Sequence, residues 1–379
     1  MESATLARCI EILRCPVTGQ ALSALAPAEL AECNQRLATR EWLHRDGTPA
    51  QMPLAGALGT PARTEIYRID ASIVWLLPDL ALVRANAVEP SALAAEKKVV
   101  QSFYDDFGWA RTDDGAFNDT VQFTDTRPVA QNYQRYCDAR IGRELPTGRY
   151  LLDVASGAIP HPEYLEFSRH YEVRICVDFS VRALREAQRK LGEGGLYLLG
   201  DITRLPLASG AIDSVISLHT VYHVPQAEQA AAIDELVRVA KPGGRVVVVY
   251  VWGSSLLMTA AFGLRRELGR LRHRLRPKRH AADATRPPEP AKPPLYFSPH
   301  NHDWFARNVA GKHAAKLKVW SAVSMGFQTH FFSDHGFGRL TMTLVKKFED
   351  WFPRLAGRYG QYPMFVIDKR PRRSEDAAP

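Results

Sequence analysis

Residues 150–251 constrain the fold of this chain most strongly, because short apolar runs alternate there with segments of helical periodicity. Nearly continuous apolar strands that alternate with helices indicate a parallel sheet buried on both faces. Two later runs, 316–324 and 364–369, are expected to return as antiparallel strands at the sheet edge. The sequence therefore predicts an α/β fold with a mostly parallel, seven-stranded sheet and helices on both faces. The central strands are predicted at 151–154, 173–177, 196–199, 214–218 and 245–251.

Composition places the chain among ordinary globular proteins. Its 379 residues suit a core domain with additions. A content of 46% apolar and 24% charged residues is typical of a soluble globular protein. No apolar run is long enough to span a bilayer, and the N-terminus lacks the apolar core of a signal peptide, so we expect a cytoplasmic protein. Five scattered cysteines and the absence of a Cys-x-x-Cys pair argue against a disulfide framework and against a bound metal.

Four regions differ in pattern. Residues 1–85 are predicted to form a small α+β module, with a polar helix at about 27–45 and strands near its end. Residues 86–149 are predicted to be a helical linker, dense in aromatic side chains. Residues 150–255 and 311–379 form the predicted core, and 256–310 are an insertion that holds a helix and a Pro-rich loop at 285–294.

Several ordered motifs in the core resemble class I S-adenosylmethionine-dependent methyltransferases of the small-molecule type. The motifs are Leu152-Asp-Val-Ala-Ser-Gly157, Val177-Asp178, Gly200-Asp-Ile-Thr-Arg-Leu-Pro206, Asp213-Ser-Val-Ile-Ser-Leu-His219 and Arg238-Val-Ala-Lys-Pro-Gly-Gly244. The resemblance covers 150–252 closely and implies a Rossmann-like fold with S-adenosylmethionine as cofactor. A nicotinamide-dependent dehydrogenase is the natural alternative, but the glycine fingerprint is too incomplete for one.

The predicted donor site follows the first three strands. A turn of small residues lets backbone N–H groups approach a charged ligand, and Asp178 at the end of strand two is suited to accept both ribose hydroxyls. Capping of the next helix is the alternative role of Asp178. The family's first loop is commonly Gly-x-Gly-x-Gly, whereas only Gly157 remains here; alanine is small, so we expect donor binding to survive. The resemblance implies these cofactor-binding residues: Asp153, Ala155, Ser156, Gly157, Asp178, Phe179, Asp201, Ile202 and, as a lid, Tyr104.

The acceptor side is predicted from histidines. Strand four ends in His219-Thr-Val-Tyr-His223, which the fold places beside the reactive methyl group, and His161 follows the first loop. Histidine suits a general base near neutral pH, although each of the three could equally be a structural residue. The Asn/Asp-Pro-Pro-Tyr signature of amino-methylating DNA enzymes is absent after strand four. We therefore predict O-methylation of a small or lipid-linked acceptor, such as a sugar or a secondary metabolite, with nucleic acid disfavoured as partner.

The N-terminal module resembles the small zinc-ribbon-like activators of some tRNA and protein methyltransferases. The matching stretch is Leu13-Arg-Cys-Pro-Val-Thr-Gly-x-x-Leu22, together with 66–77. Zinc-binding members carry more cysteines, and Thr18 stands where a second one would help, so we predict a metal-free module. Its expected role is structural or substrate-covering.

The insertion carries a basic amphipathic helix. Leu257, Ala261, Leu264, Leu268, Leu271 and Leu275 recur at helical spacing, and 265–279 holds eight Arg or Lys residues. The helix could cap the substrate site, contact an anionic membrane through 257–279, or contact RNA phosphates. Two alternative functions stay open: an RNA methyltransferase, and a non-catalytic protein that binds S-adenosylmethionine.

Overall fold

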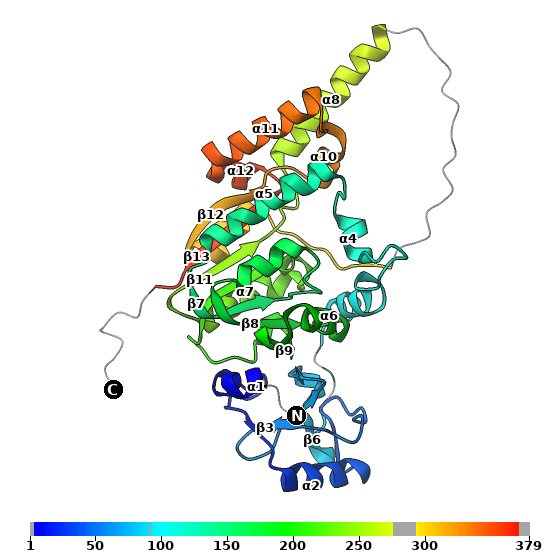
Figure 1. Cartoon of the computed structure of the whole chain (residues 1–379), viewed down its shortest axis with the longest axis vertical. Helices are drawn as coiled ribbons and strands as arrows, with labels where there is room; N and C mark the ends of the chain where they lie inside the picture. The colour runs from blue at the N-terminus through cyan, green and yellow to red at the C-terminus, as the bar shows by residue number, and fades with distance from the viewer. Residues whose placement is uncertain (1–3, 90, 92, 276–292, 371–379) are drawn as a thin grey trace.

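The computed structural model describes residues 4–89, 91, 93–275 and 293–370, with only the backbone described for 271–275. The N-terminal module lies at one end of an elongated molecule, a central sheet lies in the middle, and a group of helices lies at the other end (Figure 1). Two predicted features lie partly outside the described residues. In the basic segment 265–279, residues 276–279 lie outside the described part, and in the Pro-rich loop 285–294, residues 285–292 do.

The central sheet has the strand order β9-β8-β7-β10-β11-β13-β12. The first five of these strands pair in parallel, whereas β13 is antiparallel to both of its neighbours. The bounds are β7 Gly148–Val154, β8 Tyr171–Asp178, β9 Gly195–Leu199, β10 Ile212–Leu218, β11 Ala240–Val249, β12 Ala314–Ser321 and β13 Tyr362–Asp368. The predicted α/β fold, its strands and its antiparallel edge are confirmed. Strands β8 and β9 extend the sheet on one side of β7, whereas β10 and β11 extend it on the other side. In such sheets ligands bind in the crevice at the carboxyl ends of the two strands where the order switches, here β7 and β10.

Helices cover both faces of this sheet. Alternate residues of β7 point to opposite sides, so Leu152 and Val154 join one buried cluster and Leu151 joins the other. On the first side lie α1 (Ala4–Cys9) and α7 (Gln229–Val239); on the second lie α5 (Pro128–Glu144) and α6 (Val181–Leu191). The Ser180 hydroxyl accepts a hydrogen bond from the backbone N–H of Ala183, which confirms the predicted cap of α6.

The N-terminal module is joined to the central sheet through a shared edge. Its elements are α2 Pro27–Ala38, β1 Ser23–Ala24, β2 Trp42–His44, β3 Ala57–Gly59, β4 Ile66–Asp70, β5 Ile73–Trp75 and β6 Leu82–Arg84. Strand β5 pairs in parallel with β9, so the predicted seven-stranded sheet continues into the module. The helix predicted at about 27–45 ends earlier, because Arg40 takes a left-handed backbone conformation (φ 59°) and Trp42 begins a strand.

Between the module and the sheet, the chain forms the helical segment that the sequence predicts. It contains α3 (Ala95–Ser102), a π-helical turn (Phe103–Gly108), α4 (Asn118–Phe123) and α5. The insertion contains α8 (Leu256–Leu275) and α9 (His302–Phe305), and α10 (Met325–Phe331), α11 (Gly336–Trp351) and α12 (Pro353–Tyr359) lie between β12 and β13. Within the described ranges, no helix combines the length and the apolar composition needed to cross a bilayer.

Candidate active site

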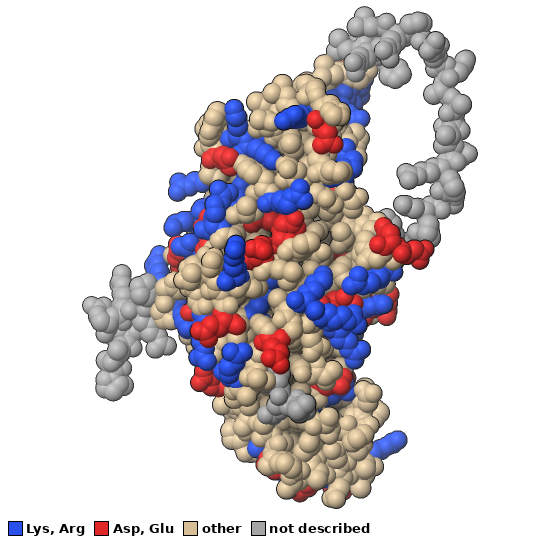
Figure 2. All heavy atoms as spheres, viewed as in Figure 1, with Lys and Arg blue, Asp and Glu red and all other residues tan. Residues whose placement is uncertain are grey.

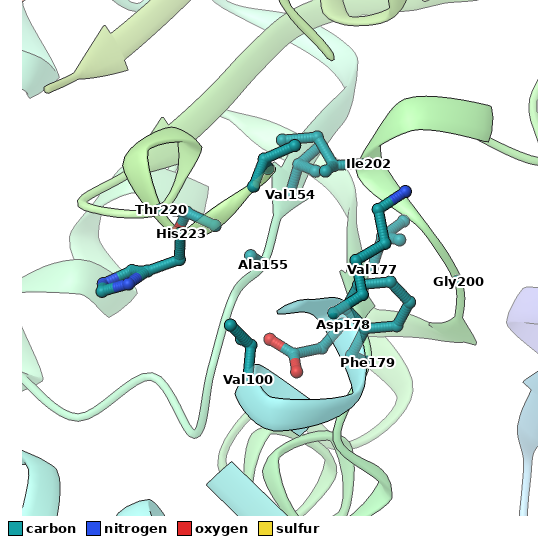
Figure 3. Close-up of a pocket in the computed structure, with 12 residues that line it drawn as sticks. Val100, Val154, Ala155, Val177, Asp178, Phe179, Gly200, Ile202, Thr220 and His223 are labelled. Atoms are coloured by element: carbon teal, nitrogen blue, oxygen red, sulfur yellow. The ribbon is translucent and has the colours of Figure 1, made fainter. Parts of the chain in front are cut away.

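A cavity lies at the carboxyl ends of β7, β8, β9 and β10. Four of the predicted cofactor-binding residues line it, as does one of the predicted histidines: Ala155, Asp178, Phe179, Ile202 and His223. Figure 3 shows the Asp178 carboxylate near Ala155, with Val100 of α3 opposite. The site therefore lies where the strand order predicts it.

Asp178 is held by two backbone hydrogen bonds. One carboxylate oxygen accepts from the N–H of Gly157 at 2.8 Å, and the other accepts from the N–H of Ser180 at 2.8 Å. Burial raises the pKa of this carboxyl to about 7, although both hydrogen bonds act to lower it. Each oxygen keeps a lone pair, so the carboxylate can accept two further hydroxyl donors. Capping and ligand binding are thus compatible roles for this side chain.

The glycine-poor loop still adopts a glycine-like backbone. Ala155 has φ 54° and Gly157 has φ 55°, both in the left-handed region that L-residues avoid. At Gly157 the reason is steric as well, because a Cβ atom would lie 2.5 Å from Cζ2 of Trp109. Alanine is therefore tolerated at position 155, while position 157 requires glycine.

Tyr104 and Trp109 cover this loop. Their rings stack with centroids 5.4 Å apart, and Trp109 belongs to a small buried cluster with Ala158 and Ala183. The indole Nε1–H of Trp109 is buried and has no hydrogen-bond partner among the described residues. An unpaired buried donor is costly, so this N–H is suited to an acceptor group on a ligand.

Asp201 is held by Lys97 and Thr203. Its carboxylate accepts from the Lys97 ammonium at 2.8 Å and from the N–H of Thr203 at 2.8 Å. Lys97 also forms an ion pair with Glu228 at 2.6 Å, and it lines the cavity itself. Sequence reasoning missed Lys97, which fastens α3 to the rim of the site.

Asp153 and Ser156 lie behind the cavity. Asp153 is buried and ion-paired with Arg174, which also donates to the carbonyl of Tyr164. The Ser156 side chain is buried beside Gly157. The predicted orienting role of Asp153 is compatible with this position, and the predicted contacts of both residues stay predictions.

The three predicted histidines lie close enough to influence one another. The pKa of His219 is lowered to about 3, chiefly by burial and then by His161 and His223. Burial also lowers the pKa of His161 and of His223 to about 4. The Nδ1 of His223 lies 2.6 Å from the carbonyl oxygen of Tyr296. A neutral His223 must donate from Nδ1 there, so Nε2 is left as an acceptor.

Tyrosines and one aspartate surround these histidines. The pKa of the Tyr222 hydroxyl is raised well above its usual range, first by burial and then by Tyr362, Tyr104, Asp119 and Tyr164. The Tyr104 ring lies 6.4 Å from the ring of His223, which lines the cavity, and both Asp119 and Asp178 add to the rise in the pKa of the Tyr104 hydroxyl that burial causes. We call the whole set the acceptor-side cluster: Tyr104, Asp119, His161, Tyr164, His219, Tyr222, His223 and Tyr362.

Sequence reasoning missed Asp119, at the start of α4, together with the cluster members Tyr164, Tyr222 and Tyr362. Burial raises the pKa of the Asp119 carboxyl to about 7, and this side chain has no hydrogen-bond or ion-pair partner in the described part of the chain. The hydroxyls of Tyr104, Tyr164, Tyr222 and Tyr362 likewise lack partners among described residues. A single aspartate in a short helix carries no sequence signal, so only the fold could identify it.

His300 and His302 lie apart from this cluster. His300 stacks on Trp304 with ring centroids 4.5 Å apart, and His302 lies beside Trp252. The described residues also contain no group of three or more His, Cys, Asp or Glu side chains that could hold a metal ion. In the N-terminal module, the Cys15 thiol lies 3.1 Å from the Tyr67 hydroxyl.

Known proteins resemble the central part of this chain. Residues 152–248 match the family model described as a methyltransferase domain. An uncharacterized methyltransferase of Mycobacterium sp. (strain JLS) is 34% identical over 108 residues, which is 28% of this chain and 41% of the relative. Demethylmenaquinone methyltransferase of Beutenbergia cavernae is 36% identical over 101 residues, 27% of this chain and 40% of the relative. The chain thus spans about two fifths of the length of these curated relatives.

Among solved structures, phosphoethanolamine N-methyltransferase 1 of Haemonchus contortus, in complex with phosphoethanolamine and S-adenosylhomocysteine, is 13% identical with a TM-score of 0.44. The match covers 74% of this chain and 51% of that chain. The family match to 152–248 supports S-adenosylmethionine as the cofactor of the cavity. The sequence prediction is confirmed in its coarser form: residues 152–248 carry a methyltransferase domain of the class I type.

Proposed function

We propose that the chain transfers a methyl group from S-adenosylmethionine to a hydroxyl of a small or lipid-linked acceptor, such as a sugar or a secondary metabolite. The observation that carries the proposal is Asp178, whose two oxygens are each fixed by a backbone N–H and still free to accept one more hydrogen bond. It lines a cavity that reaches His223 and so borders the acceptor-side cluster.

The donor cavity has groups suited to each part of the donor. Asp178 would accept the ribose hydroxyls, and the unpaired Nε1–H of Trp109, which covers the adjoining loop without lining the cavity itself, would donate to the carboxylate of the amino-acid end. Val100, Val177 and Ile202 supply an apolar lining for the adenine ring. S-adenosylmethionine supplies a methyl group activated by its sulfonium. The protein's part is to hold and align the two reactants.

Asp119 is the residue we assign to proton removal. Asp119 would take the proton of the acceptor hydroxyl as that oxygen receives the methyl group, so its carboxylate would end the transfer protonated and neutral. A carboxyl whose pKa lies near 7 is better matched to this task than imidazoles whose pKa lies near 3 or 4. The histidines and tyrosines are then available to orient the acceptor by hydrogen bonds, with His223 accepting through Nε2.

The charge of the acceptor-side cluster favours a small acceptor over RNA. Among the described residues, Lys190 acts electrostatically on His161, but no lysine or arginine forms a hydrogen bond or an ion pair with a side chain of this cluster. Phosphate backbones are bound chiefly through such cations. An acceptor without phosphate at the reacting end fits these surroundings better.

Calorimetry with S-adenosylmethionine tests the donor half. Asp178→Ala should weaken binding about 100-fold, since hydrogen bonds to a charged group contribute ~1.5–3 kcal/mol each. Asp303→Asn is the control, because that side chain is 77% exposed and does not line the cavity. Unchanged affinity in Asp178→Ala would contradict the site.

Transfer of radiolabelled methyl to a panel of alcohols, phenols and sugars tests the acceptor half. Product with any of these supports the proposal. Donor binding with labelled RNA as the only product would instead support an RNA methyltransferase. Donor binding without any labelled product would support the non-catalytic alternative.

A further inference from the structure

Helix α11 presents apolar side chains on two opposite sides. One side carries Met342 and Val345, which pack against the core, and the buried Glu349, which is paired with Arg140. The other side carries Phe337, Leu340, Leu344 and Trp351, which are 75%, 53%, 56% and 70% exposed. The spacing of these four residues places them in one stripe along the helix. Most of the outward stripe therefore lies outside the contact that α11 makes with the core.

Exposed apolar side chains are concentrated at this end of the molecule. Nine of the fifteen large hydrophobic residues exposed in the described part of the chain lie on or next to α8, α11 and α12. Besides the α11 stripe these are Phe352, Leu355, Leu256, Leu264 and Leu268. Single exposed leucines are common on proteins, but a group of this size marks an interaction surface.

The three helices share one end of the molecule (Figure 1). Phe262 of α8 packs on Phe327 and Phe331 of α10. Contacts then continue from α10 to α11 and from α11 to α12. We call this end of the molecule, formed by the exposed residues of α8, α11 and α12, the helical end face.

Cations border the apolar residues of the helical end face. The exposed charged residues there are Arg265, Arg266, Arg270, Arg339, Lys347, Arg354 and Arg358 against Glu267 and Asp350, with Asp334 just before α11 and beside Arg339. Figure 2 shows tan surface at this end, with more blue than red side chains among it. Glu267 forms an ion pair with Arg270 at 2.6 Å. The other arginines and the lysine of the helical end face therefore leave it with a net positive charge. An apolar stripe with a cationic border matches the boundary between acyl chains and anionic headgroups.

From this geometry we propose that the helical end face docks on an anionic lipid bilayer, with the outward stripe of α11 as its apolar anchor. The sequence predicts membrane contact through 257–279; the structure moves the main contact to α11 and leaves α8 as a basic flank. The positive excess selects a lipid surface over a second copy of this chain, because two copies would bring like charges together across the contact. This docking does not depend on the proposed methyl transfer.

Vesicle flotation with the full chain tests the docking. The protein should float with vesicles of equal parts phosphatidylcholine and phosphatidylglycerol at low salt. It should float poorly with pure phosphatidylcholine and poorly at high salt. The variant Leu344→Glu/Trp351→Glu should stay at the bottom with all vesicles. Arg354→Glu/Arg358→Glu should bind anionic vesicles at least roughly fivefold more weakly for each arginine reversed.

Two matched controls carry the same substitutions elsewhere. Met52→Glu and Arg84→Glu change exposed residues of the N-terminal module and should float like the wild type. Thermal melting shows whether each variant is folded, and donor binding by Leu344→Glu/Trp351→Glu separates failed docking from failed methyl transfer. Light scattering without vesicles reports the oligomeric state.

Three results would overturn the docking. The first is a wild type that does not float with anionic vesicles. The second is a folded Leu344→Glu/Trp351→Glu variant that floats as well as the wild type. The third is a wild-type dimer without vesicles that Trp351→Glu converts to a monomer, because a second copy would then cover the face.

Discussion

The donor cavity and the acceptor-side cluster lie side by side but are assembled in different ways. The donor cavity takes most of its lining from strand ends within 154–202, a continuous part of the chain. The acceptor-side cluster draws on residues 104, 119, 161–164, 219–223 and 362, which only the folded topology brings together. A local motif thus defines the donor half, whereas the acceptor half is defined by segments far apart in sequence. The two halves should therefore be separable by mutation.

The largest expected effect separates them through Asp119. Asp119→Asn removes the proposed proton acceptor and keeps the shape of the side chain. We expect kcat to fall ~100–10,000-fold, the range typical of a lost general base. Affinity for S-adenosylmethionine, measured by calorimetry, should stay within twofold, because Asp119 does not line the donor cavity.

A structural role for Asp119 would give a different pattern. If the residue only supports the fold, Asp119→Glu should be as damaging as Asp119→Asn, and the loss in kcat should not depend on pH. Two results would support proton transfer. Asp119→Glu should recover part of the lost kcat, and the wild-type kcat should rise with pH around pH 7, a dependence that Asp119→Asn should lack. Donor affinity that falls together with kcat would show that the two halves are not independent.

A smaller effect, about tenfold, concerns the pH dependence of donor binding. Ribose hydroxyls donate to the ionised carboxylate, and burial raises the pKa of Asp178 to about 7. Protonation therefore competes with binding, and affinity should rise about tenfold from pH 6 to pH 8. Calorimetry at a series of pH values measures it.

Two variants sharpen this test. Asp178→Asn cannot ionise, so it should bind weakly with no slope in this range, while Asp119→Asn should keep the wild-type slope. Affinity that falls as pH rises would contradict the assignment of Asp178 as the acceptor of the hydroxyls.

The contrast also explains what sequence could predict. Apolar strands, turns and Asp178 follow from local patterns, so the α/β fold, the strand positions and the place of the cavity were predictable. Lys97 and Asp119 were not, because neither stands in a pattern that distinguishes it from a solvent-exposed charge. The outward stripe of α11 shows the same limit. Its spacing is that of any amphipathic helix. Only the packing of Met342 and Val345 shows that α11 is buried on their side, so that the stripe faces outward.

The boundary of the N-terminal module escaped prediction for a related reason. Alternation in 66–77 indicates strands but not their partners. In the structure Val74 pairs with Leu198, so the module supplies an edge strand to the sheet. The pairing with β9 depends on residues more than a hundred positions away, which a single sequence does not reveal.

The smallest effect tests whether the donor loop is strained by its missing glycine. Alanine in the left-handed region costs ~1–2 kcal/mol, and glycine loses more chain entropy on folding. At φ 54° the relief of backbone strain should exceed the entropic cost of glycine. Ala155→Gly should therefore raise the free energy of unfolding by about 1 kcal/mol. Urea denaturation of the donor-free protein measures it.

Ala158→Gly is the matched control for this loop. Ala158 is fully buried and has no left-handed backbone, so glycine there loses packing and adds chain entropy without relieving strain. It should lower the free energy of unfolding by ~1 kcal/mol. Opposite signs for two Ala→Gly changes three residues apart would locate the strain at the point where the loop turns toward the donor. Equal destabilisation by both would show that Ala155 is relaxed in its conformation, and that one glycine is enough for this loop.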